Sequence, residues 1–223
     1  MGERWRTGWL DAVVYDSGVE RERVARVFGK LMWGTDTRRI YAGIAELRDL
    51  RDGSAVLDVP CGGGVAFRGL RPSAQVRYVA ADISPVMLRR ARREAERRGV
   101  ANTVEFLEAD AESLPFDDGE FDLCLTYAGL HCLARPERAL AEMARVVRPG
   151  GTLHGTSAVT GEGGRYDRLI SLYRRAATFG RVGNTTEILA WLGEAGIENV
   201  ELDTSGAIAF FCGRRAAGLA GRA

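Results

Sequence analysis

The chain has 223 residues, of which 46% are hydrophobic and 27% are charged, and its formal net charge is +1. This composition is typical of a globular domain with a sizeable core, and the near-neutral charge provides no global field for binding nucleic acid or an acidic membrane. No stretch approaches the roughly 20 apolar residues of a membrane span, the first residues lack the apolar run of a signal peptide, and the scattered cysteines form no CxxC pair, which predicts a cytoplasmic protein with reduced thiols.

Residues 1–53 are predicted to form a helical cap. Apolar Ile40, Ile44 and Leu47 recur at helical spacing, and Asp52 with Gly53 predicts a turn that ends the region. Aromatic residues are concentrated here and again in residues 159–183, which are predicted to form a mobile helical lid. An apolar or aromatic small molecule suits such a lining, and we expect it to contact Tyr15, Trp33, Tyr166 and Tyr173.

From Ala55 onward, predicted strands and helices alternate. The predicted strands are Ala55–Val59, Val76–Ala81, Val104–Glu108, Phe121–Ala128 and Thr152–Ser157. The predicted helices are Val65–Leu70, Pro85–Arg98 and Pro136–Val147. This alternation is typical of a doubly wound, Rossmann-like α/β fold, in which helices cover both faces of a mostly parallel sheet.

The last third of the chain follows a different pattern. A helix is predicted over Thr186–Ala195, and two apolar strands, Asn199–Leu202 and Ala207–Cys212, flank a Ser-Gly turn and should form an antiparallel hairpin. We therefore expect one ligand-binding domain over residues 54–213, with the lid inserted at 159–183 and a frayed tail at 214–223.

Three acidic residues follow three of the predicted strands. Asp58, Asp82 and Asp110 each stand at or just after the end of a strand. Ligands of doubly wound sheets bind beyond the carboxyl ends of the strands, so the three carboxylates predict a ligand site at that edge.

A glycine loop after the first strand narrows the choice of ligand to a nicotinamide dinucleotide or S-adenosylmethionine. The dinucleotide fingerprint G-x-G-x-x-G fails here, because Gly62 and Gly64 are followed by Phe67 at the third position. Asp58 would also repel a pyrophosphate over this loop, whereas it would attract the ammonium and sulfonium groups of S-adenosylmethionine. Asp82 can accept ribose hydroxyls in either case.

Several spaced segments resemble the class I S-adenosylmethionine-dependent methyltransferases, and within them the broad group that acts on small molecules. The segments that carry the resemblance are Val56–Gly64, Ala81–Ser84 with Met87 and Leu88, Asp110–Phe116, Phe121 with Asp122, and Arg145–Gly151. One departure is Pro60, which stands where the family usually has the first glycine of the loop and which lacks an N–H group.

The resemblance implies a role for each matched position. It assigns residues to the methionine moiety (Asp58, Cys61, Gly62, Gly64), the ribose (Asp82), the adenine (Ile83, Met87, Asp110, Ala111) and the methyl-bearing side (Tyr127). No metal is expected, and no nucleic-acid partner is expected because the sequence shows neither a basic stripe nor an added binding module.

Methyl transfer from a sulfonium is an in-line displacement, so positioning and a dry pocket can supply much of the catalysis. If the acceptor is a hydroxyl group, a base would help, and His131 follows the fourth strand near the expected methyl site. Two alternatives stay open: a protein of the same fold that binds S-adenosylmethionine in a scaffold or cyclisation role, and an NAD-dependent reductase.

Overall fold

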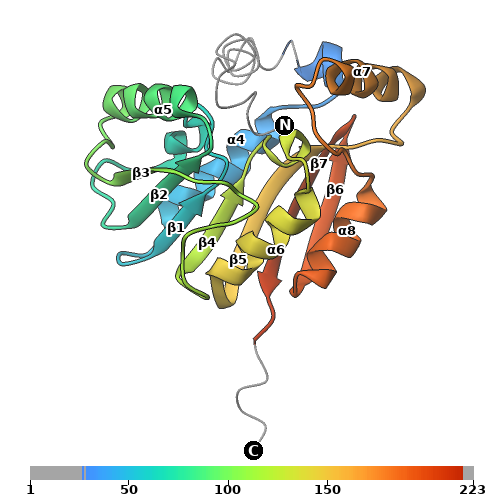
Figure 1. Cartoon of the computed structure of the whole chain (residues 1–223). Helices are drawn as coiled ribbons and strands as arrows, with labels where there is room; N and C mark the ends of the chain where they lie inside the picture. Colours follow the sequence, from blue (N-terminus) through green and yellow to red (C-terminus); the bar gives the residue numbers. More distant parts are fainter. Residues whose placement is uncertain (1–26, 28, 218–223) are drawn as a thin grey trace, which may run out of the picture.

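The computed structural model describes residue 27 and residues 29–217 (Figure 1), so Tyr15 lies outside the described part. The strands of this part are β1 Ala55–Asp58, β2 Arg77–Asp82, β3 Val104–Glu108, β4 Phe121–Thr126, β5 Val147–Ala158, β6 Ile197–Ser205 and β7 Ile208–Arg215. They form one sheet in the order β3-β2-β1-β4-β5-β7-β6. The strands β1 to β5 pair in parallel, and β7 is antiparallel to β5 and β6, which confirms the predicted fold class.

The helices of the described part lie on both faces of this sheet (Figure 1). They are the π-helix η1 Gly29–Trp33, the α-helices α4 Arg38–Ala45, α5 Pro85–Arg98, α6 Pro136–Val146, α7 Gly164–Arg175 and α8 Thr185–Glu194, and the 3-10 helices η2 Glu46–Asp49, η3 Val65–Gly69 and η4 Leu130–Cys132. Each of α5, α6 and α8 begins within one residue of its predicted start.

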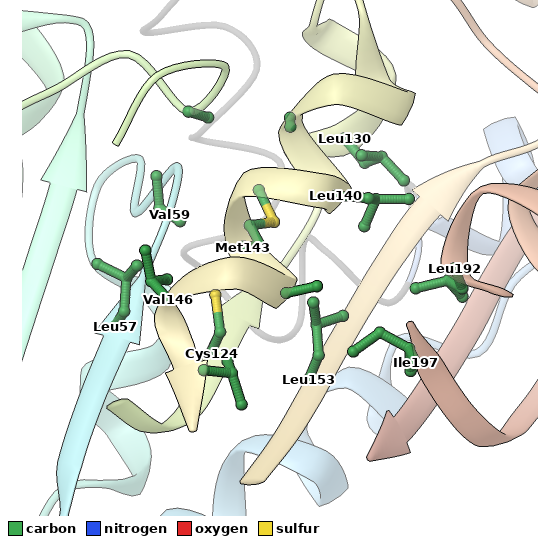
Figure 2. Close-up of a cluster of buried hydrophobic side chains, with 14 of the residues drawn as sticks. Leu57, Val59, Cys124, Leu130, Leu140, Met143, Val146, Leu153, Leu192 and Ile197 are labelled. Atoms are coloured by element: carbon green, nitrogen blue, oxygen red, sulfur yellow. The ribbon is translucent and has the colours of Figure 1, made fainter. Parts of the chain in front are cut away.

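One face of the sheet is covered by α6 and α8. Leu140 and Met143 of α6 and Leu192 of α8 are buried against strand residues such as Leu57 and Leu153, and Figure 2 shows these side chains converging. Helices with apolar stripes on one side bury them in this way, and the burial is the dominant stabilising term of such layered folds.

The other face is covered by α4, η3 and α5. Ile44, Phe67 and Leu88 pack in a second cluster with Val56 of β1 and Tyr78 of β2. The helix α5 starts at a Ser84 cap, whose hydroxyl accepts from the Met87 N–H, and ends at Gly99 in the left-handed region. Together the two clusters place β1, β2 and β4 in the middle of a three-layer domain.

The C-terminal strands are longer than predicted. The hairpin turn lies near Gly206 as expected, but β7 continues through Arg215, so residues 214 and 215 belong to the sheet and not to a frayed tail. Pairing with β5 from Thr152 to Ala158 provides backbone partners along the strand, and these partners override the weak strand propensity of its Gly and Arg residues. Asn184 caps α8 through a capping box with Glu187.

Candidate functional site

Two adjoining cavities open at the carboxyl ends of β1, β2 and β4. The inner cavity has a volume of about 770 Å³ and is lined by Ile40, Pro60, Cys61, Gly62, Gly63, Val65, Asp82, Ile83, Met87, Tyr127, Ala128, Gly129, Cys132 and Leu133. The outer cavity has a volume of about 780 Å³ and is lined by Val59, Pro60, Ile83, Ala109, Asp110, Ala111, Glu112, Cys132, Leu133, Ala134 and Arg135. Because four residues border both, the cavities form one cleft, which lies at the predicted edge.

Most of the residues that the resemblance assigns to the cofactor meet in this cleft. The inner cavity brings together Cys61, Gly62, Asp82, Ile83, Met87 and Tyr127, and the outer one adds Asp110 and Ala111. Asp58, Gly64 and His131 line neither cavity.

The glycine loop is tied to strand β2 by a backbone hydrogen bond. The Cys61 N–H donates to the carbonyl of Ala81 at 2.9 Å, and Gly62 borders open space. Gly64 instead serves the fold, because its φ is +86° and a Cβ there would lie 2.3 Å from the Phe67 ring. The predicted ligand contact at Gly64 is therefore corrected: Gly63 lines the cleft, and Gly64 makes the turn into η3.

Asp82 links the loop to the start of α5. Its two carboxylate oxygens accept from the Gly62 N–H at 2.9 Å and from the Ser84 N–H at 2.8 Å. Burial raises the pKa of Asp82 to about 6, and these two hydrogen bonds oppose the rise. The carboxylate borders the inner cavity and keeps lone pairs for a ligand that donates hydroxyl hydrogens.

Asp58 lies under the loop and is almost fully buried, with 1% of its surface exposed. The Tyr78 hydroxyl donates to its Oδ2 at 2.9 Å. Burial raises the pKa of Asp58 to about 7, the Tyr78 hydrogen bond lowers it, and the nearby Asp82 raises it. The predicted direct contact with a ligand is thus corrected to a position beneath the residues that line the cleft.

The outer cavity carries its polar groups at one end. Asp110 is exposed, and its Oδ1 accepts from the Glu112 N–H at 2.9 Å. The Glu112 carboxylate accepts from both the backbone N–H and the Nε of Arg135, which joins this wall to the first turn of α6. A hydrogen-bond acceptor at Asp110 therefore stands on a braced loop, where an amino group of a ligand could donate to it.

Tyr127 separates the inner cavity from a groove between α4 and the strands β5, β7 and β6. The groove is also lined by Glu46, His154 and Cys212, and a Cβ at Gly43 would lie 3.1 Å from the Tyr127 hydroxyl. Burial and the neighbouring acids raise the pKa of Tyr127 well above its usual range, so its hydroxyl is protonated. His154 is half-buried.

His131 cannot act as the predicted base. Its Nδ1 accepts from the Ala158 N–H at 3.0 Å, so the proton of the neutral ring lies on Nε2, which then has no lone pair for abstracting a proton. Burial lowers the pKa of His131 to about 3, and its ring packs edge-on to Phe179 with centroids 4.5 Å apart. The side chain joins η4 to the end of β5.

Replacing His131 by alanine is expected to lower the free energy of unfolding by about 3 kcal/mol, because a buried ring and its hydrogen bond are lost. The affinity for S-adenosylmethionine should change by less than about threefold. Urea unfolding and calorimetric titration measure the two quantities, and His154→Ala, at a half-exposed ring, should cost less stability. Unchanged stability with a loss of turnover would restore the catalytic interpretation.

The burial of His131 also makes the free energy of unfolding depend on pH. The folded pKa of His131 is lowered from 6.5 to about 3, so the unfolded chain takes up its proton first as the pH falls. The contribution of His131 to stability is therefore complete above pH 6.5 and is lost progressively between 6.5 and 3.

The aromatic residues predicted to line a ligand pocket pack mainly on one another. The ring centroids of Trp33 and Tyr173 lie 5.8 Å apart. The ring of Tyr173 stacks on that of Phe179, with centroids 4.8 Å apart. Tyr166 is half-buried against the same cluster, which also holds Ile170 of α7. These contacts correct the prediction that Trp33, Tyr166 and Tyr173 face the cleft, since they hold α7 on the domain.

Several lining residues carried no recognisable signal in the sequence. Ile40 arrives from α4, and Cys132 and Leu133 arrive from η4, so their position in the cleft depends on how these helices dock. At position 129 a glycine is required for a steric reason that only the structure reveals, because a Cβ there would lie 2.3 Å from the Pro60 ring. The sequence signal for a place in the cleft was its position two residues after Tyr127, on the loop after the fourth strand.

Comparison with known proteins agrees with this geometry. A family model described as "Methyltransferase domain" matches residues 57–154. The ubiquinone/menaquinone biosynthesis C-methyltransferase UbiE of Pseudomonas putida (strain GB-1) is 44% identical over 113 residues, which are 48% of this chain and 43% of that protein. The chain thus spans less than half the length of that relative.

Two solved structures share the fold at low sequence identity. The [4+2]-cyclase SpnF aligns over 82% of each chain with a TM-score of 0.66 and 23% identity. The phosphoethanolamine N-methyltransferase 2 of Haemonchus contortus, solved with S-adenosylhomocysteine, aligns over 96% of this chain and 60% of its own, with a TM-score of 0.73 and 14% identity. Residues 57–154, which include the glycine loop and the acid at the end of β2, thus form a methyltransferase domain of the class I S-adenosylmethionine-dependent type.

Proposed function

We propose that the protein transfers a methyl group from S-adenosylmethionine to a small, apolar or aromatic acceptor by in-line displacement. The observation that carries this proposal is the cleft itself. Two of its acids, Asp82 and Asp110, stand in different cavities, with apolar Ile83 shared between the cavities. That spacing suits a ligand with a ribose, an adenine and a charged amino-acid end.

The residues of the cleft fit this cofactor. Gly62 has open space where a side chain would project, so a ligand can approach the loop backbone closely. Asp82 would accept the ribose hydroxyls, Ile83 and Met87 would pack on the adenine, and Asp110 would accept from its amino group. A pyrophosphate fits less well, because the Gly62 N–H is already held by the Asp82 carboxylate.

The acceptor side of the cleft offers enclosure more than acid–base chemistry. Bound S-adenosylmethionine supplies an electrophilic methyl group on a positively charged sulfur. Ile40, Val65 and Leu133 provide apolar walls, and the described lining residues include no histidine. These residues would exclude water and hold the acceptor in line with the methyl group, which is the contribution that such a displacement needs.

The segment between β5 and α8 is part of this proposal as a cover for the acceptor. Its Gly180 and Arg181 N–H groups donate to the carbonyls of His131 and Leu133, at 2.9 and 3.0 Å. Residues 159–183 are thereby tied to the strand-end wall of the cleft.

Within the described residues, no helix is long and apolar enough to cross a bilayer. The cytoplasmic location stays a prediction.

A second candidate is a protein that binds S-adenosylmethionine without transferring its methyl group, in a scaffold or cyclisation role. The lack of a histidine base in the described cleft is compatible with this candidate, because a site that works by enclosure alone can serve either reaction. The likeness to SpnF concerns the fold.

Calorimetric titration with S-adenosylmethionine, S-adenosylhomocysteine and NAD tests the binding part of the proposal. We expect the two sulfur compounds to bind and NAD not to bind. Methyl release is then assayed against a panel of phenols, amines and carboxylates. Binding without release to any acceptor of the panel would favour the second candidate, and NAD binding alone would contradict the assignment.

The affinity for S-adenosylmethionine is expected to rise with pH between 5.5 and 8. Asp58 and Asp82 have pKa values raised to about 7 and about 6, so both are partly protonated in the free protein at acidic pH. A cationic ligand needs their charged forms, so the dissociation constant should be at least about tenfold higher at pH 5.5 than at pH 8. A constant value over this range would contradict the assigned roles.

The titration of Asp58 and Asp82 does not unfold the protein at acidic pH, so unfolding through these groups does not explain a loss of affinity there. A carboxyl whose folded pKa is raised stabilises the fold most below its unfolded pKa of 3.8 and loses that contribution as the pH rises through 6 to 7. Circular dichroism at pH 5.5 provides the control, since His131 acts in the opposite direction at this pH.

A further inference from the structure

Tyr78 places a hydroxyl group in the interior of the sheet, beneath the glycine loop. It is fully buried as the second residue of β2, where it pairs with Val56 of β1. Asp58 lies two residues further along β1, so it projects on the same face as Val56. The Tyr78 hydroxyl reaches diagonally across the two strands and donates to Asp58 Oδ2 at 2.9 Å.

Packing of the Tyr78 ring fixes the direction in which its hydroxyl group points. The Phe67 ring of η3 meets the Tyr78 ring edge-on, with centroids 5.7 Å apart and an interplanar angle of 79°. Phe67 follows the glycine loop directly, and its ring also occupies the space next to Gly64. The loop, the aromatic pair and the carboxylate therefore form one packed unit, in which the phenol has little freedom to turn away.

The charges around Asp58 leave it without a countercharge inside the described protein. The titratable groups that interact with Asp58 or with its partner are Asp82 on β2, Cys61 in the loop, Cys124 on β4 and Tyr127 just after β4. None of them is a cation. Burial and Asp82 raise the pKa of Asp58, and the Tyr78 hydroxyl is the group that lowers it.

We propose that Tyr78 is a positioning residue for the cofactor: its hydroxyl holds the Asp58 carboxylate charged and fixed beneath the glycine loop, where the negative charge attracts the cationic methionine end of S-adenosylmethionine. The inference rests on the proposed function. In the low-dielectric interior the field of Asp58 is weakly screened, so the charge acts through the loop that covers it. The bound cation supplies the missing countercharge.

The test is calorimetric titration of S-adenosylmethionine at pH 6, 7, 8 and 9 with the full chain and with Tyr78→Phe. Without the hydroxyl, Asp58 ionises at a higher pH. We expect the midpoint of the pH dependence to move up by about one unit and the dissociation constant at pH 7 to rise about fivefold. At pH 9 the two proteins should differ by less than about threefold, because Asp58 is then charged in both.

The control is Tyr41→Phe, which removes the same atom from another tyrosine of the same cluster, on α4, and should leave the pH profile unchanged. Asp58→Asn should abolish the upper part of the pH dependence, and in that background Tyr78→Phe should have no further effect. An identical profile for Tyr78→Phe and the unchanged chain, or a weakening of equal size at every pH, would overturn the inference. Failure of the unchanged chain to bind S-adenosylmethionine would instead overturn the proposed function.

Discussion

Asp82→Asn is expected to weaken the binding of S-adenosylmethionine by about 100-fold or more, which corresponds to about 3 kcal/mol. The carboxylate already accepts from the N–H groups of Gly62 and Ser84, and it borders the inner cavity. In asparagine one oxygen becomes an NH₂ group. One of the two backbone N–H groups would then face a donor, and the charge that strengthens hydrogen bonds from ribose hydroxyls would be gone.

Asp52→Asn is the matched control for this prediction. Asp52 is exposed in the turn that precedes β1, at the opposite edge of the sheet from the cleft. We expect it to change the dissociation constant by less than about twofold. The measurement is calorimetric titration at pH 8, with circular dichroism to verify that both variants are folded. Equal affinities for Asp82→Asn and the unchanged chain would remove Asp82 from the cofactor site.

The layers of this fold follow from local patterns. A strand is predicted from Ala55 before the glycines, and a helix is predicted over Pro85–Arg98. Both are confirmed. The carboxyl ends of parallel strands must meet at one edge, so the location of the cleft could also be predicted. These features depend on few interactions beyond each segment itself.

The roles of individual side chains in the cleft depend on contacts between distant segments. His131 stands at the expected place in the sequence, but its Nδ1 is taken by the backbone of Ala158, and no local pattern reveals that hydrogen bond. Trp33 and Tyr173 are aromatic residues in the predicted cap and lid, and their rings pack against each other instead of against a ligand. A residue type indicates which chemistry is possible, whereas packing decides which face the side chain presents.

The same limit applies to the glycine loop. The run from Gly62 to Gly64 offers three equivalent residues to a reader of the sequence. The structure separates them, because Gly62 and Gly63 line the cleft while Gly64 is required by the adjacent Phe67 ring. The difference arises from the direction in which the chain enters η3, and that direction is set by the second apolar cluster.

Gly69→Ala is expected to lower the free energy of unfolding by about 3 kcal/mol and the melting temperature by about 6 °C or more. A Cβ at Gly69 would lie 1.9 Å from the carbonyl oxygen of Ile44 and 2.8 Å from Cβ of Leu47. The first of these atoms is backbone, so no rotamer change can relieve the clash. Either η3 or the pair of α4 and η2 must move.

The movement should also reach the cleft, because α4 carries Ile40 into the inner cavity and η3 begins with Val65. Gly69→Ala should therefore lose cofactor affinity together with stability. Gly193→Ala is the control: it lies in α8 with nothing near its Cβ position, and alanine there should stabilise the helix by about 0.5–1 kcal/mol. Thermal and urea unfolding measure both variants. If Gly69→Ala proved as stable as the unchanged chain, the close contact between η3 and α4 that places Ile40 in the cleft would be incorrect.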